Sequence, residues 1–112
     1  MTTRQLSRLS HYWQRKLRLQ DWQISIAFAE QDEMHSSDNV GECYAQLCDR
    51  TAHVKVMKNG QTDYELELSI IHEYLHILFV DMAPKNPVKR SLFEAAIDQT
   101  ATTLLWFKGA RP

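Results

Sequence analysis

Residues 69–79 hold the pattern His-Glu-x-x-His inside an apolar, helix-forming run, and this pattern constrains the fold more than any other feature. Residues four apart lie on one face of an α-helix, so His72 and His76 can present two imidazole nitrogens to one metal ion. Glu73 lies beside that face, within reach of a water on the metal. The pattern predicts a helix that carries part of a zinc hydrolase site, with Glu73 as the general base that takes a proton from the metal-activated water.

The alternative is a buried helix whose two histidines only hydrogen-bond to their neighbours. The flanking apolar residues, such as Ile71 and Leu75, place the histidines against a core, where unpaired imidazoles would be costly. Residues 62–65, Thr-Asp-Tyr-Glu, form a capping-box pattern that starts the helix. Further metal-ligand candidates follow downstream. These three features favour the metal site.

The downstream candidates are Glu94 and Asp98, four residues apart on a second predicted helix. A catalytic zinc takes three protein ligands and one water, so Glu94 can complete a set with His72 and His76. Asp98 can accept the other ring N–H of a ligand histidine. Residues 91–94 are also a capping-box pattern, in which Glu94 would only cap a helix; we favour a helix start at Asn86-Pro87, which leaves Glu94 free.

With this spacing of His72, Glu73, His76, Glu94 and Asp98, residues 62–108 resemble the gluzincin clan of zinc metallopeptidases. The length and order of elements resemble the single-domain minigluzincins. Residues 94–101 are similar to the second helix of ImmA/IrrE-type metallopeptidases, which are common in phages and prophages. The resemblance implies a zincin-like fold and a zinc endopeptidase. In that family His72, His76 and Glu94 would be the ligands, Glu73 the base and Asp98 the group that orients a ligand.

Hydrophobic periodicity predicts one α+β domain over residues 1–112: an N-terminal helix, a small three-stranded sheet with a hairpin, then a metal-binding helix and a glutamate helix. Helices covering one face of the sheet are expected. The expected elements are a helix over 3–19, strands over 22–30, 40–48 and 51–57, a polar loop over 31–39, and helices over 63–82 and 88–108.

The strand over 40–48 is the candidate for the substrate-binding edge strand that the resemblance implies. Its central residues Cys43, Tyr44, Ala45 and Gln46 would lie along the peptide. Cys43, Ala45 and Leu47 should share one face, because side chains alternate along a strand.

A second donor usually stabilises the oxyanion in peptide hydrolysis. Tyr44, Tyr74 and His53 are the candidates, and the spacing selects none of them. Tyr74 is turned away from the ligand face, which favours packing. His53 alternates with apolar neighbours, which favours an exposed position.

Composition limits the partners and the cellular location that can be expected. The net charge is −1 and offers no general attraction to nucleic acid, although residues 3–19 form a basic amphipathic helix. The N-terminus has no long apolar segment and no apolar run reaches membrane-spanning length, so we expect no membrane partner. Cys43 and Cys48 are expected to be free thiols in the cytoplasm.

Three functions remain open at this point: a zinc endopeptidase acting on a peptide or protein, a catalytically weak, metal-stabilised binding or regulatory module, and an interaction protein using the basic helix. The larger enzymes of the clan carry a second subdomain that builds the cleft. We therefore expect a shallow cleft here, or one that an oligomer or a partner completes.

Overall fold

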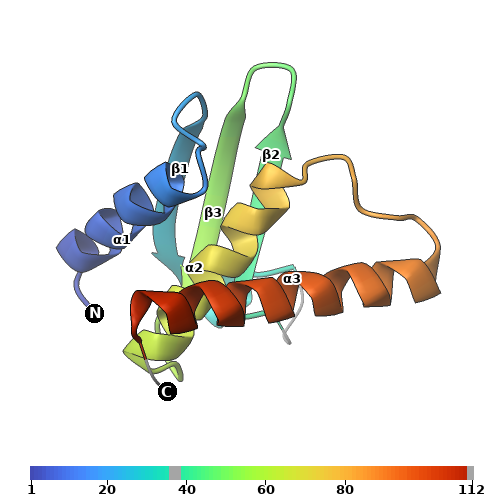
Figure 1. Ribbon diagram of the computed structural model, residues 1–112. Helices are drawn as coiled ribbons and strands as arrows, with labels where there is room; N and C mark the ends of the chain where they lie inside the picture. Colours follow the sequence, from blue (N-terminus) through green and yellow to red (C-terminus); the bar gives the residue numbers. More distant parts are fainter. Residues whose placement is uncertain (36–38, 111–112) are drawn as a thin grey trace.

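The computed structural model describes residues 1–35 and 39–110. Its elements follow the expected order (Figure 1). They are α1 (Thr3–Lys16), β1 (Gln23–Ala29), the short 3-10 helix η1 (Gln31–Glu33), β2 (Gly41–Gln46), β3 (Thr51–Met57), α2 (Asp63–Leu78) and α3 (Pro87–Lys108). The expected α+β class is confirmed, as is a three-stranded sheet that contains a hairpin. Residues 36–38 of the expected loop lie outside the described residues.

The sheet has the strand order β1-β3-β2. β2 and β3 form the antiparallel hairpin, and β1 pairs in parallel with β3. Strand β3 is therefore central, and its residues Ala52, Val54 and Val56 are buried. Within residues 1–35 and 39–110, β2 pairs only with β3, so its other side is a free sheet edge, as the sequence analysis expected for this strand.

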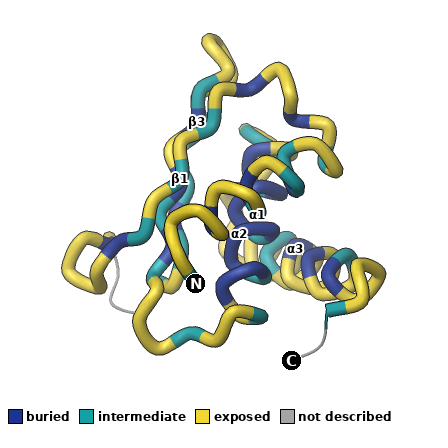
Figure 2. The backbone as a smooth tube through the Cα atoms, turned by 90° about the vertical axis from the view of Figure 1, so that its left-hand side faces the viewer, coloured by how far each residue is buried: buried dark blue, intermediate teal, exposed yellow. Residues whose placement is uncertain are grey.

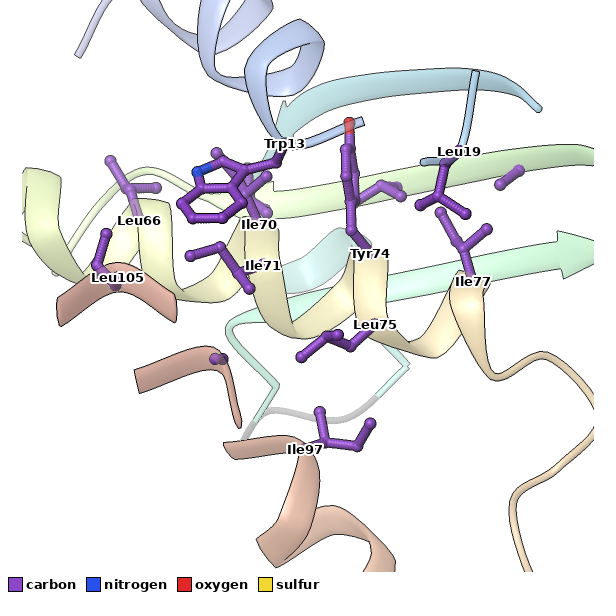
Figure 3. Close-up of a cluster of buried hydrophobic side chains, with 14 of the residues drawn as sticks. Trp13, Leu19, Leu66, Ile70, Ile71, Tyr74, Leu75, Ile77, Ile97 and Leu105 are labelled. Carbon is purple, nitrogen blue, oxygen red and sulfur yellow. The ribbon is translucent and has the colours of Figure 1, made fainter. Parts of the chain in front are cut away.

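The helices lie on one side of the sheet (Figure 2). Helix α2 contacts both β2 and β3 on one side and α3 on another, so it runs through the middle of the molecule. Figure 3 shows Tyr74 pointing toward α1, whereas Leu75 points toward Ile97 of α3. A helix with neighbours on several sides needs apolar residues around most of its circumference, which explains the continuous apolar run of α2.

The N-terminal caps of α2 and α3 are the ones that the sequence predicts. The hydroxyl of Thr62 accepts the backbone N–H of Glu65, whose carboxylate accepts the N–H of Thr62 in return. At α3, the Asn86 side chain accepts the backbone N–H groups of Val88 and Lys89. The helix start at Asn86-Pro87 is therefore confirmed, and Glu94 lies inside α3. The left-handed residue Gly109 ends this helix.

Four elements are shorter than expected. Strand β1 covers Gln23–Ala29 and not residues 22–30. The first helix ends at Lys16 and not at residue 19, and α2 ends at Leu78 and not at residue 82. The positive φ angles of Arg18 and Asp81 turn the chain there, at residue types that give a weaker signal than glycine. Strand β2 ends at Gln46 and not at residue 48.

The end of β2 also corrects the expected face of Leu47. A four-residue turn begins at Leu47, which is 49% exposed. Cys43 and Ala45, in contrast, pack against the core as expected. Cys48 lies in the turn, and both cysteines are free. Among residues 1–35 and 39–110, no helix combines the length and apolar character that crossing a bilayer requires.

Tyr74 supplies a stability test. Its side chain is fully buried, and its hydroxyl hydrogen-bonds to the buried hydroxyl of Ser10 on α1. Replacing Tyr74 with Phe leaves the Ser10 hydroxyl without this partner, so we expect the free energy of unfolding to fall by about 1–3 kcal/mol in a urea titration. Adding Ser10→Ala should recover most of the loss, because both polar groups are then gone. A double variant no more stable than Tyr74→Phe would contradict this account.

Candidate metal centre

His72 and His76 lie one turn apart on α2, and Glu94 reaches them from α3. The Oε2 atom of Glu94 is 3.3 Å from the Nε2 atom of each histidine, and its Oε1 atom is 3.1 Å from His76 Nε2. One donor atom from each of the three residues lies within 4.8 Å of the others. The structure thus brings together the three residues that the sequence analysis selected as ligands.

These distances can be compared with a tetrahedral zinc site. Ligand atoms about 2.0–2.2 Å from a tetrahedral ion lie about 3.3–3.6 Å from one another. The 3.3 Å separation of Glu94 Oε2 from both imidazoles falls at the lower end of that range. Two imidazoles and one carboxylate are also the donor set of His2Glu zinc sites. The residues present therefore fit a divalent cation such as Zn²⁺.

Asp98 lies next to the three donor residues. Its Oδ1 atom is 2.7 Å from Nδ1 of His72. A proton on Nδ1 is donated to this carboxylate, which leaves the lone pair of Nε2 directed toward Glu94. Asp98 thus occupies the orienting position that the sequence analysis expected, and it can fix both the tautomer and the rotation of the His72 ring.

The register of α3 against α2 explains why Glu94 and Asp98 face the histidines. Ile97 is 2% exposed and points into the interface with α2. Glu94 lies one turn before Ile97 and Asp98 follows it directly, so burying Ile97 turns both carboxylates toward α2. Phe93 adds ring contacts with His76 and Phe79, with centroids 6.0 and 6.4 Å apart. The same apolar packing that joins the helices therefore assembles the site.

Glu73 of α2 is 8% exposed, and its side chain packs against Gly41 of β2. Burial raises the pKa of its carboxyl to about 7; His72 opposes this shift, and the carboxylates of Glu94 and two other acidic residues add to it. Among the residues that the structure describes, none hydrogen-bonds to the carboxylate of Glu73, and no oxygen of this carboxylate is both fully buried and unpaired. Its carboxylate lines the hollow that contains His72, His76 and Glu94. It is thus placed to accept a hydrogen bond or a proton from a molecule in that hollow.

Gly41 on β2 packs directly against Glu73. A Cβ atom at Gly41 would lie 3.1 Å from Oε2 and 3.3 Å from Cγ of Glu73. The sequence analysis did not single out Gly41. A glycine at the start of a strand can mark a close approach of another group, so a signal was present, but it does not name the group that approaches.

The hollow beside the three donor residues has a volume of about 570 Å³. Cys43, Tyr44 and Ala45 of β2 line it, in agreement with the expected position of this strand. Gln46 lines a separate, smaller hollow farther along the strand. A second hollow of about 420 Å³ lies on the other side of Glu73.

The three candidate oxyanion donors have different positions. Tyr44 lines the hollow at the site, 42% exposed. Tyr74 does not reach it: the next position along the helix after Glu73 is rotated toward α1, where the hydroxyl bonds to Ser10. His53 is exposed on the outer face of the sheet and bonds to Ser25, because it alternates with the buried residues Ala52 and Val54. Tyr74 is packed and His53 is exposed, as the sequence analysis favoured for each, so neither can donate to an oxyanion at the site. Tyr44 stays a candidate.

Two further residues of the site escaped the sequence analysis. Glu42 is 7% exposed and accepts hydrogen bonds from the backbone N–H of His35 and the amide of Asn39. It thereby joins His35 and Asn39 to β2. His35, which the sequence analysis took as an ordinary loop residue, lines the hollow with its ring 5.6 Å from that of Tyr44. These contacts depend on a loop that carries no periodic pattern.

Comparison of the chain with protein-family models, with curated proteins and with solved structures found no match. The functional interpretation of this centre therefore rests on the geometry and chemistry of its own residues.

Proposed function

We propose that this protein is a zinc-dependent endopeptidase of the gluzincin type with a zincin-like fold. The observation that carries the proposal is the position of Glu94 Oε2, 3.3 Å from Nε2 of both His72 and His76, with the buried Glu73 beside them. One carboxylate can accept hydrogen bonds from two imidazoles, so the position of Glu94 alone does not call for a cation. The second carboxylate, Asp98 behind His72, favours a shared cation, because a proton on Nδ1 that is donated to Asp98 leaves the Nε2 lone pair facing Glu94.

In the proposed mechanism His72, His76 and Glu94 would hold the zinc, and Asp98 orients His72. The bound ion would lower the pKa of water and polarise the peptide carbonyl. Glu73 accepts a proton from water as the water oxygen bonds to the carbonyl carbon. Glu73 then returns this proton to the amide nitrogen as the C–N bond breaks, which releases the amine product. Tyr44 is the candidate donor to the carbonyl oxygen.

The free edge of β2 supports a peptide as the substrate. An extended peptide can pair its backbone with the N–H and C=O groups of an edge strand, and Cys43, Tyr44 and Ala45 lie on the strand beside the proposed zinc site. We place the activity in the cytoplasm, in a phage- or prophage-type setting, and expect an oligomer or a partner to complete the shallow cleft.

Metal removal tests the proposal. Protein purified without chelators should contain about one zinc per chain and cleave members of a diverse peptide library. Treatment with a chelator, followed by its removal, should abolish cleavage, and added zinc should restore it. The measurements are metal analysis and mass spectrometry of the products. Cleavage that persists in metal-free protein would overturn the proposal. Bound zinc without cleavage of any peptide would favour the metal-stabilised binding module instead.

A further inference from the structure

We propose that the groove along β2 selects extended peptides that carry Lys or Arg on both sides of the bond to be cut, and rejects acidic peptides. This inference rests on the proposed function, because it names the class of substrate that the same site takes. Three observations carry it: the continuity of the groove, the charge of its lining, and the environment of Glu73.

The two hollows beside α2 form one path. Asn39, Gly41, His72 and Glu73 line both of them, so they meet at Glu73 and His72. One hollow continues along Cys43, Tyr44 and Ala45 and the other toward the start of α2. A peptide lying against β2 would therefore pass from one hollow into the other, with its central bond next to Glu73.

The lining of this path is acidic. Six carboxylates line the two hollows, and neither hollow has a Lys or Arg among its described lining residues. The six are Glu42, Glu65, Glu73, Asp81, Glu94 and Asp98. A divalent cation would offset only two of these charges. Exposed Asp81 and Glu65 line different hollows, one on each side of Glu73, where they can meet side chains on both sides of the central bond.

This charge is local to the groove. The whole chain carries a net charge of −1, with 13 basic residues. Several of them, including Arg4, Arg8, Arg15 and Lys16, lie on α1. Figure 1 shows α1 beside β1, on the opposite side of the molecule from β2. A charged peptide would therefore meet a negative surface at the groove, although the protein as a whole is almost neutral.

Glu73 is the third observation, because its side chain faces both hollows. Its side chain is 8% exposed and lines both hollows, and it has no hydrogen-bond partner among the described residues. Because this carboxylate faces the hollows, it can accept a hydrogen bond from a molecule in the groove. The acidic lining then decides which molecules can bring a polar group to Glu73.

Peptide binding to the full chain with Glu73→Gln tests the inference without cleavage. Three labelled peptides of about ten residues, which extend over about 33 Å, differ only in carrying Lys, Gln or Glu at the same alternate positions. Fluorescence anisotropy should show the Lys peptide binding about tenfold more tightly than the Gln peptide at about 0.1 M salt, and the Glu peptide binding more weakly than both. The preference should shrink toward 1 M salt, where the screening length falls to about 3 Å. Metal-free and zinc-loaded protein should show the same order.

Two double variants, each made in the Glu73→Gln protein, show which carboxylates cause the preference for the Lys peptide. Glu65→Gln keeps the helix cap and Asp81→Asn tolerates the left-handed backbone, so this pair removes two groove charges with little change in structure. It should lower the preference for the Lys peptide about threefold to tenfold, since one exposed ion pair changes an equilibrium constant by about 1.4- to 5-fold. The control pair, Glu30→Gln with Asp32→Asn, removes two exposed charges that do not line the groove and should leave the preference unchanged.

Equal affinity for the Lys and Glu peptides would overturn the inference, as would an equal effect of the two double variants. Cleavage of the same peptides by the parent separates this result from the proposed function. If the parent cleaved peptides of either charge equally well, the proposed endopeptidase activity would stand and the proposed charge selection would be refuted. If the Lys peptide bound most tightly but the zinc-loaded parent cleaved no peptide, the proposed charge selection would stand and the proposed endopeptidase activity would be refuted.

Discussion

Replacing Glu73 with Gln is expected to lower kcat/KM for peptide cleavage by about 10²–10⁴-fold while the protein keeps its zinc. Gln has almost the same shape as Glu but cannot accept a proton at neutral pH, so the variant loses the proposed base and little else. Glu73 does not belong to the group formed by His72, His76 and Glu94, and metal binding should therefore remain. Zinc content and the rate of cleavage of a fluorogenic peptide should be measured on the same preparation.

Glu67 offers a matched control for this substitution. It is also a buried glutamate of α2, at 8% exposure, but its carboxylate accepts the indole N–H of Trp13 and pairs with Lys108, away from the metal centre. Glu67→Gln should lower the stability of the protein and leave kcat/KM of the folded fraction within about twofold of the parent. If Glu73→Gln cleaved as well as the parent, Glu73 would not be the base.

Replacing Gly41 with Ala should lower kcat by about threefold to tenfold, less than the cost of a 1 Å displacement, with zinc content unchanged and KM changed much less. The added methyl group would lie 3.1 Å from Oε2 and 3.3 Å from Cγ of Glu73, so the carboxylate must shift by a few tenths of an ångström. Displacing a catalytic group by about 1 Å can cost about 10²-fold in rate. Steady-state kinetics and metal analysis of the purified variant give the three quantities.

Gly109→Ala is the control for a general loss of stability. Gly109 ends α3 with φ at +96°, and a Cβ atom there would have no neighbour within 4 Å. The alanine is strained by its backbone conformation, so the unfolding temperature should fall, but the kcat of the folded protein should not. The account of Gly41 would be wrong if its alanine variant kept kcat within twofold of the parent, or if Gly109→Ala lost kcat to the same extent.

Part of the site could be predicted from local patterns. The spacing of His72 and His76 places both imidazoles on one face of any helix that contains them. The capping residues Thr62 and Asn86 set where α2 and α3 begin, and the Asn86-Pro87 start left Glu94 inside α3. The β2–β3 hairpin followed from alternation and a short connection. These features depend on a few consecutive residues, so they can be predicted from the sequence alone.

What the sequence by itself determined is therefore the two helices, the hairpin and the selection of His72, His76, Glu94 and Asp98 as a set. Only the tertiary structure decided that Gly41 contacts Glu73, and that Tyr44 lines the hollow while Tyr74 and His53 do not. It also decided that carboxylates from four segments line two adjoining hollows. Such contacts arise from strand order and from the rotation of packed helices, which depend on burying apolar surface across the whole domain. No short stretch of sequence determines how apolar surface is buried across the whole domain.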